Sequence, residues 1–432
     1  MAEVQYYSEM RPTREAWLGA IPSSWQLRRL KYLFAIKKDI AGELGHTVLS
    51  VTQKGIRPKV MTDKGQFAQD YSKYQLVHKG DFVMNHMDLL TGWVDISDQD
   101  GVTSPDYRVF YDIDLKRYLP AYYRYLFQLC YSARIFYGFG QGVAGFGRWR
   151  LPTDAFMNFV LPVPPIEEQQ AIAAYLDDQC AQIDAYISEA QTSIGDYNQW
   201  RASIIYEAVT KGTKPSVESR ITHDMWVKEL PNGIKLSRVG LHFDLILGKM
   251  LCPNQLEPSY SLEPYYCAAN VHFSGVDETG LKQMWFSSEE KKRYAVKSGD
   301  LLVVEGGAGA GGCSIAHPSQ NVYVQNSIMI VRPKKQQDVR YLKYLLEMLV
   351  GRGYIDFVCN KATIPHFTKE KLANVPFPVF SEQETREICD YIDVAYRMIN
   401  DIIADKEQLI RDLELYKRSL IYEAVTGKRK VV

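Results

Sequence analysis

Apolar residues recur with a heptad spacing along two long stretches of the chain, which begin near residues 172 and 388. In each stretch the steps settle into an alternation of four and three residues, the pattern of a helix that packs along one seam against another helix. Each predicted helix has about 45 residues and is roughly 65 Å long. One globular domain cannot cover a helix of this length, so we predict that the two helices pair with each other as an antiparallel coiled coil. The predicted helix-pairing seam contains Ile183, Ile187, Ile194, Tyr197, Ile204, Ile399, Ile403, Ile410, Leu413 and Leu420.

Upstream of each long helix the pattern changes to short runs of β-branched and aromatic residues, which predict strands. The predicted strands are 47–52, 81–85, 107–111, 300–305 and 327–331. One shorter helix is predicted in each half, at 122–130 and 339–350, with Asp114 and Asp338 as candidate N-caps. Many strands and few helices predict the α+β class for each globular part.

The chain repeats itself. The hexapeptide Ile-Tyr-Glu-Ala-Val-Thr occurs at residues 205–210 and again at 421–426, an offset of 216 residues. Other matches follow in the same order, including Glu168-Gln169 with Glu382-Gln383 at an offset of 214. An ordered set of matches indicates a duplicated module and hence an internal pseudo-twofold repeat. The predicted organisation is a globular domain at 1–160, a helical region at 161–212, a second globular domain at 213–375 and a second helical region at 376–432.

Composition adds that the chain is an ordinary globular protein, with 46% hydrophobic and 24% charged residues. The net charge is zero, but the four segments have net charges of +4, −6, +4 and −2 in chain order. This alternation predicts one kind of partner for the globular parts and another for the helices. The start lacks the features of a signal peptide, no apolar run is long enough to span a membrane, and seven cysteines are scattered. A cytoplasmic protein fits these features.

Motifs for catalysis are weak. The glycine-rich stretch 305–312 precedes a predicted strand rather than the helix that a nucleotide-binding loop needs, so we predict a plain loop. Asp106, Asp114 and Lys116 resemble a metal-dependent nuclease signature, but the second half has no equivalent of Asp106. The histidines, cysteines and aspartates that could bind a metal have no recognised zinc spacing. We therefore predict a non-catalytic protein without a metal site.

Basic segments in both globular parts are candidates for binding DNA, because Arg, Lys, Asn and Gln side chains suit phosphates and base edges. Most such segments, taken singly, are solvated surfaces, and the repeated excess of positive charge is what favours DNA. The candidate DNA-binding residues are Gln53, Lys54, Arg57, Lys59, Arg148, Arg150, Asn270, His272, Lys291, Lys292, Arg293 and Lys361.

Taken together, the chain resembles the specificity subunit of type I restriction–modification enzymes over nearly its full length. The resemblance depends on Pro-Val-Pro-Pro-Ile-Glu-Glu-Gln at 162–169 and Pro-Phe-Pro-Val-Phe-Ser-Glu-Gln at 376–383, each of which opens a long helix. It also depends on Gly-Asp before an apolar strand at 80 and at 299, and on the two hexapeptides that end the helices.

The resemblance implies that each globular domain is a target-recognition domain that reads one half of a bipartite, asymmetric DNA target. It implies that the helices set the spacer between the halves and dock two modification subunits, which methylate adenine with S-adenosylmethionine. Restriction subunits, ATP-dependent translocases and nucleases, would join this complex. The chain itself would bind no cofactor, with S-adenosylmethionine, ATP and Mg²⁺ on the partner subunits.

Three alternatives remain open at this level. The chain could be the specificity partner of a methylation-only or other phage-defence complex. It could be a self-contained nuclease or methyltransferase, in which case the isolated chain would cleave or methylate DNA. It could also be a coiled-coil assembly protein, which predicts no salt-dependent DNA binding.

Overall fold

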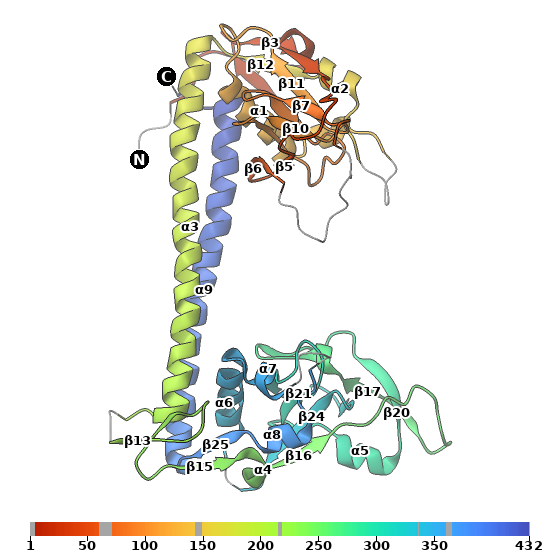
Figure 1. Cartoon of the computed structure of the whole chain (residues 1–432), viewed down its shortest axis with the longest axis vertical. Helices are drawn as coiled ribbons and strands as arrows, with labels where there is room; N and C mark the ends of the chain where they lie inside the picture. Colours follow the sequence, from red (N-terminus) through yellow and green to blue (C-terminus); the bar gives the residue numbers. More distant parts are fainter. Residues whose placement is uncertain are drawn as a thin grey trace. The chain divides into compact units, whose positions relative to one another are not determined.

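The computed structural model describes residues 5–59, 71–142, 149–214, 218–335, 337–359 and 365–431. They form two compact units: unit 1 combines Met1–Ala190 with Glu407–Val432, and unit 2 is Gln191–Lys406. Each unit contains one globular domain and a stretch of each of two long helices, α3 (Ile166–Lys211) and α9 (Glu382–Val425) (Figure 1). The predicted helical segments 161–212 and 376–432 are thus each divided between the units, whereas 1–160 and 213–375 each lie in one.

Unit 1 is built on a four-stranded antiparallel sheet of order β4-β11-β8-β9. Helix α1 (Pro120–Ser132) packs on one face, where the ring of Phe127 lies 5.4–5.5 Å from the rings of Phe34, Phe82 and Phe110. Because side chains alternate between the faces of a strand, the neighbouring Val83 and Val109 point to the other face. A hairpin packs on those valines. The strands of this sheet and hairpin are β4 (Phe34–Lys37), β5 (Leu49–Thr52), β6 (Gly55–Pro58), β8 (Phe82–Met84), β9 (Val94–Ile96) and β11 (Arg108–Asp112).

Short two-stranded pairs, β1-β2, β7-β10 and β3-β12, complete the described part of the globular domain of unit 1. These and the remaining short helices are β1 (Met10–Pro12), β2 (Ala20–Pro22), β3 (Gln26–Arg29), β7 (Gln75–Val77), β10 (Gly101–Thr103), β12 (Val160–Val163), α2 (Thr153–Asn158), η1 (Leu30–Tyr32) and η2 (Phe136–Phe139).

Unit 2 repeats the sheet with the order β16-β24-β21-β22, and α6 (Val339–Gly351) is the counterpart of α1. It also has a three-stranded sheet, β20-β17-β23, in which β17 pairs antiparallel with β20 and parallel with β23. Unit 1 has a similar arrangement, because β5 pairs antiparallel with β6 and Val48, just before β5, forms a parallel bridge with Val102 of β10. The strands of the two sheets are β16 (Phe243–Leu247), β17 (Ser261–Tyr266), β20 (Lys282–Phe286), β21 (Leu301–Val304), β22 (Cys313–Ile315), β23 (Tyr323–Val324) and β24 (Ile328–Pro333).

The other elements of unit 2 are short. They are β13 (Ser219–Ile221), β14 (Glu229–Pro231), β15 (Lys235–Arg238), β18 (Val271–His272), β19 (Gly275–Val276), β25 (Pro376–Val379), α4 (Val239–His242), α5 (Ser288–Tyr294), α7 (Tyr354–Val358), α8 (Lys369–Ala373) and η3 (Ala268–Asn270). The glycine-rich stretch 305–312 is a loop that leads into β22, as predicted.

The predicted strands and short helices are confirmed, with ends that differ by one or two residues. Asp338 caps α6, where its carboxylate accepts a hydrogen bond from the Arg340 backbone N–H. The prediction of Asp114 as the equivalent cap is wrong. It opens a turn before the helix, and α1 begins at Pro120 after Leu119. A proline in the first turn has no N–H to satisfy, so this helix start has less need of a side-chain cap.

Strand pairing corrects the match between the halves. Leu27 pairs with Pro162, and its counterpart Leu236 pairs with Pro378. Pro162 therefore corresponds to Pro378, an offset of 216, and not to Pro376. Because prolines occur at alternate positions in both segments, the two sequences can also be aligned with a shift of two residues. Such a shift keeps every side chain on the same face of the strand, and the match by sequence alone contained it.

The same correction extends into the long helices, because α3 begins at Ile166 and α9 at Glu382. Gln169 corresponds to Thr385, and its predicted match with Gln383 is wrong. Gln169 is fully buried, whereas Gln383 is exposed.

Helices α3 and α9 run antiparallel to each other within each unit. In unit 1, Asp184 of α3 forms an ion pair with Lys417 of α9 at 2.6 Å, and Arg429, just after α9, donates a hydrogen bond to the Tyr175 hydroxyl of α3 at 3.3 Å. In unit 2, the Arg201 side chain donates a hydrogen bond to Asn400 at 3.4 Å, and Lys406 lies 6.0 Å from the ring of Tyr197. In both units, residue numbers fall along α9 as they rise along α3, which is the predicted antiparallel pairing.

Every predicted seam residue lies at a buried or half-buried position. Ile183, Ile204, Ile399 and Leu420 are buried, and Ile187, Ile194, Tyr197, Ile403, Ile410 and Leu413 are half-buried. No helix in the described ranges is both long and apolar enough to cross a membrane.

The end of each long helix docks on a globular domain that the other half of the chain supplies. In unit 1 the Tyr122 hydroxyl of α1 donates to the carbonyl of Val425 at the end of α9, at 2.8 Å. In unit 2 the Tyr341 hydroxyl of α6 donates to the carbonyl of Val209 near the end of α3, at 2.7 Å. Both valines belong to the repeated hexapeptide and are fully buried. The two copies of the hexapeptide thus occupy equivalent docking sites, one in each unit.

Candidate nucleic-acid interface

Four candidate residues of unit 1 lie on or next to the β5-β6 hairpin. Gln53 and Lys54 form its two-residue tip, where Gly55 takes a positive φ of 100° that favours glycine. Arg57 is exposed because it alternates with the buried Ile56, and Lys59 follows the hairpin, also exposed. The hydrophobic face of the hairpin therefore directs all four polar side chains away from the core.

The hairpin tip lines a groove of about 770 Å³ in unit 1. Its other walls come from α1 and from the unit 1 stretches of α3 and α9. Basic and acidic side chains face it together, among them Lys417, Arg418 and Asp177. Gln53 and Lys54 thus face the helices across this groove, whereas Arg57 and Lys59 do not line it.

Arg150 lies at another edge of this domain, where it is exposed and bridges to Gln141. Burial, together with the positive charges of Arg108 and Arg150, lowers the pKa of His86 to about 4. His86 is therefore neutral at pH 7. Arg148, the neighbouring candidate, lies outside the described residues.

Arg108 is a basic residue of this edge that the sequence did not single out. It is 3% exposed, and its guanidinium donates to the Leu151 carbonyl at 3.1 Å and lies 4.5 Å from the ring of Phe156. Burial lowers the pKa of Arg108 to about 10, so it stays charged at neutral pH. The sequence contains no signal for this residue, because an arginine inside an apolar strand is known to be buried only from the packing around it.

The equivalent edge of unit 2 has different charges. The backbone N–H of Leu151 donates to the His86 carbonyl, and that of Phe367 donates to the Glu305 carbonyl. His86 and Arg150 therefore correspond to Glu305 and His366, whose side chains lie 3.2 Å apart. At these two positions unit 1 has a neutral histidine and an arginine, and unit 2 has an acid beside a histidine.

The unit 2 candidates Asn270 and His272 have structural contacts. The Asn270 side chain accepts a hydrogen bond from the Cys267 backbone N–H at 2.9 Å and donates to the Asp277 carbonyl at 3.0 Å. One ring nitrogen of His272 lies 3.0 Å from the Ala269 carbonyl. Both side chains hold the turn around η3, although His272 is exposed.

Three further unit 2 candidates lie on α5. Lys291 pairs with Glu263 at 3.2 Å, and Lys292 pairs with Glu289 at 2.8 Å. Arg293 is exposed on the same helix. Two of the three positive charges thus have acidic neighbours, which weakens the local positive potential. Lys361 lies outside the described residues.

The candidates therefore fall into separate groups: the hairpin and Arg150 in unit 1, and the η3 turn and α5 in unit 2. The described residues contain no group of three or more His, Cys, Asp or Glu side chains that could hold a metal ion.

Comparisons with known proteins agree with this architecture. The family model described as "Type I restriction modification DNA specificity domain" matches residues 22–190 and 264–412, more than half of the chain. A Methanocaldococcus jannaschii protein named "Putative type I restriction enzyme MjaX specificity subunit" is 21% identical over an alignment of 452 residues that covers 99% of each chain.

Two solved structures share the fold. One, from work on complex assembly and conformational transition of the type I R-M system, has a TM-score of 0.70 and 15% identity, and covers 94% of this chain and 98% of its own. The HsdS subunit from Thermoanaerobacter tengcongensis has a TM-score of 0.55 and 16% identity, with the same coverage.

Proposed function

The chain belongs to the type I restriction–modification DNA specificity family, whose members are non-catalytic DNA-recognition subunits, and on this premise we propose that each globular domain reads one half of a bipartite, asymmetric DNA target. The observation that carries the proposal is a common scaffold with different exposed elements. Both units keep the four-stranded sheet and its helix. The exposed elements beside it differ: unit 1 has the tight β5-β6 hairpin, whereas in unit 2 the corresponding strands β17 and β20 are joined through η3 and the β18-β19 pair, and α5 follows β20. Different exposed groups suit different base edges, so the two half-sequences differ.

The long helices act, in this proposal, as the element that sets the spacer between the half-sequences. Support comes from their continuity: α3 and α9 are unbroken helices that each contribute to both units. A helix rises 1.5 Å per residue, so four added residues lengthen it by about 6 Å, close to two base-pair steps.

This proposal is tested by inserting four residues after Ala190 in α3 and four after Lys406 in α9. We expect a spacer about two base pairs longer, with both half-sequences unchanged, in a map of methylated adenines in host DNA. The same insertion between Thr213 and Lys214, outside both helices, is the control and leaves the spacer as it is. An unchanged spacer in the double insertion contradicts the proposal.

The partners in this proposal are double-stranded DNA, two modification subunits that dock on the helices, and restriction subunits that join them. S-adenosylmethionine, ATP and Mg²⁺ belong to those partners. Support comes from Trp200 of α3 and Tyr416 of α9, which occupy equivalent positions and are 54% and 48% exposed. Exposed aromatic side chains are frequent centres of protein–protein interfaces. Two equivalent aromatic residues favour two equivalent docking sites.

A further inference from the structure

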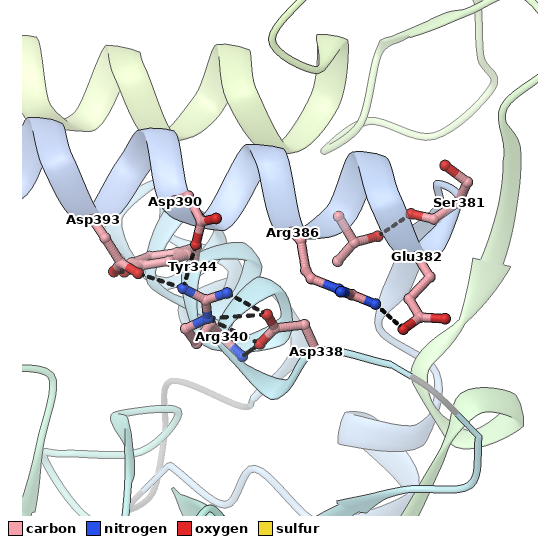
Figure 2. A network of polar contacts seen from close by, with 9 residues as sticks. Asp338, Arg340, Tyr344, Ser381, Glu382, Arg386, Asp390 and Asp393 are labelled. Atoms are coloured by element: carbon pink, nitrogen blue, oxygen red, sulfur yellow. Dashed lines mark hydrogen bonds and ion pairs between the residues drawn. The ribbon is translucent and has the colours of Figure 1, made fainter.

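In unit 2, polar side chains on one face of α6 reach across to α9 (Figure 2). The Arg340 guanidinium donates to Asp390 at 2.8 Å and to Asp393 at 2.7 Å. It also bonds to Asp338, the N-cap of its own helix, at 2.7 Å. The hydrogen bond to Asp338 raises the pKa of Arg340 most, and those to Asp390 and Asp393 raise it further, whereas burial lowers it. Arg340 thus stays charged and joins the start of α6 to α9.

Two further contacts follow along the same face of α6. The Tyr344 hydroxyl donates to Asp393, and the Tyr396 hydroxyl of α9 donates to Glu347 at 2.7 Å. Residues 340, 344 and 347 are spaced by four and three, so they share one face of the helix. We call Tyr344–Asp393 the central contact, and Arg340–Asp390 and Glu347–Tyr396 the outer contacts.

Unit 1 has the central contact. Helices α1 and α6 correspond at an offset of 219, and α3 and α9 at 216. Tyr125 therefore corresponds to Tyr344 and Asp177 to Asp393, and the Tyr125 hydroxyl donates to Asp177 at 2.7 Å. Arg124 adds an ion pair to the same carboxylate at 2.6 Å.

Neither outer contact has an equivalent in unit 1. The positions of Arg340 and Asp390 are taken by Ala121 and Ala174, whose methyl groups form no polar contact. The positions of Glu347 and Tyr396 are taken by Gln128 and Cys180. The Gln128 amide donates instead to the Val94 carbonyl of β9, at 3.2 Å.

The groove beside these helices is also larger in unit 1 than in unit 2. In unit 1, Gln128 and Cys180 line the groove of about 770 Å³. In unit 2 the corresponding groove, which Glu347 lines, has a volume of about 340 Å³. In unit 2 the Arg352 guanidinium also lies 4.4 Å from the ring of Tyr206, on the wall of that groove.

On the basis of the proposed function, we propose that Arg340 and Glu347 are positioning residues that fix the orientation of the second globular domain on its stretch of the helix pair. On the matching face of α1, the first domain has the central contact without the two outer ones. Its other polar contacts with the long helices lie elsewhere, among them those of Gln169 with the Leu119 backbone N–H and of Tyr122 with the Val425 carbonyl. The spacer selectivity of the subunit therefore depends on the outer contacts of unit 2.

The physical reason is that the outer contacts lie on both sides of the central contact along α6. Both domains share an apolar core with the helices, in which Ile172 and Leu176 take part in unit 1 and Ile388 and Ile392 in unit 2. An apolar contact is not directional, so it resists separation more than rotation. Hydrogen bonds and ion pairs on both sides of the central contact have defined geometry and oppose rotation about it.

The test uses the complete complex of this chain with its modification subunits. The target is first read from the methylated adenines of host DNA. Methylation rates are then compared on duplexes that contain this target with the natural spacer, or with one base pair added or removed. In Arg340→Ala combined with Tyr396→Phe, we expect the rate on altered spacers, relative to the natural one, to rise roughly two- to tenfold, the change that a few contacts of this kind produce in an equilibrium.

Matched variants separate positioning from general stability. Arg386→Ala removes an ion pair of α9 with Glu382 on the same helix and leaves α6 untouched (Figure 2), so it keeps the spacer selectivity. Arg340→Lys restores part of the selectivity, because it keeps the charge.

Each outcome either supports or overturns the positioning role of Arg340 and Glu347. If the Arg340/Tyr396 variant keeps the spacer selectivity of the unaltered complex, or if its rates fall equally on all spacers, the two residues do not position the domain. A changed half-sequence preference also overturns the inference. If the unaltered complex shows no bipartite target or no spacer selectivity, the proposed function itself fails, which is a distinguishable result.

Discussion

Gln169 is the residue whose role the structure changed most. It is fully buried at the start of α3, where its side-chain oxygen accepts from the Leu119 backbone N–H at 2.8 Å. Its amide nitrogen donates to the carbonyls of Arg117 and Pro164, both at 2.9 Å. One side chain thus satisfies three backbone groups in the segments that lead into α1 and α3. A buried backbone group without a partner is costly, so Gln169 stabilises the junction of the domain with its helix.

We predict that Gln169→Ala lowers the free energy of unfolding of unit 1 by about 2–4 kcal/mol, since the variant leaves those backbone groups without partners. Urea denaturation followed by tryptophan fluorescence measures the change. Gln383→Ala is the control: this residue is exposed and bonds within α9 to Glu387, so its loss costs less than about 0.5 kcal/mol. Equal losses in the two variants would contradict the role of Gln169 as the partner of these backbone groups.

Residue type alone could not assign the DNA-binding candidates. Asn270, Lys291 and Lys292 were candidates because their side chains suit DNA, and the structure gives each of them a protein partner. Arg57 was chosen on the same grounds and projects from a hairpin. The difference lies in which neighbours the fold brings within hydrogen-bonding distance, which spacing along the chain does not specify.

At the scale of elements, the central feature is the exchange of helix ends. The end of α9 docks on the sheet-and-helix domain of unit 1, and the end of α3 on that of unit 2. The repeated hexapeptide predicted that the helix ends matter. It could not reveal that each end packs on a domain that the other half of the chain supplies, because that depends on the antiparallel direction of the pair.

We predict that Tyr122→Phe and Tyr341→Phe each lower the free energy of unfolding of their own unit by about 1–2 kcal/mol, because each loses one buried hydrogen bond to a helix-end carbonyl. Thermal and urea denaturation of the full chain provide the measurement. Tyr186→Phe, at a position 59% exposed on α3, is the control without effect. A loss in one tyrosine variant and none in the other would show that the two docking sites are not equivalent.

At the scale of the whole molecule, duplication predicts duplicated docking. Trp200 and Tyr416 are equivalent and exposed, whereas Tyr186 is exposed and its counterpart, Ile402, is half-buried. We predict that Trp200→Ala and Tyr416→Ala each remove one modification subunit from the complex, since losing an aromatic residue at an interface centre weakens binding by at least about 2 kcal/mol, ~30-fold in Kd.

Native mass spectrometry of the purified complex counts the subunits in each variant. We expect two modification subunits per chain without substitution, one in either single variant and none in the double variant, while Tyr186→Ala retains two. Two subunits in both single variants, or none in either, would contradict a pair of equivalent docking sites.

The sequence by itself determined the elements whose pattern is local. Heptad spacing identified both long helices, and the repeated hexapeptide identified the duplication. Short runs of β-branched and aromatic residues identified five strands, among them the two central strands of each four-stranded sheet. These properties depend on residues close together in the chain, which helical and strand periodicity relate directly.

Tertiary structure decided everything that depends on which distant residues meet. It showed that Gln169 corresponds to Thr385 in the repeat. It also showed that Arg340 bonds to carboxylates on α9, a contact that Ala121 at the corresponding position does not make. Polar pairing and burial arise between segments separated by many residues, and no periodicity along the chain records them. The duplication could therefore be recognised from the sequence, whereas the different contacts of the two copies depend on the packing of each unit.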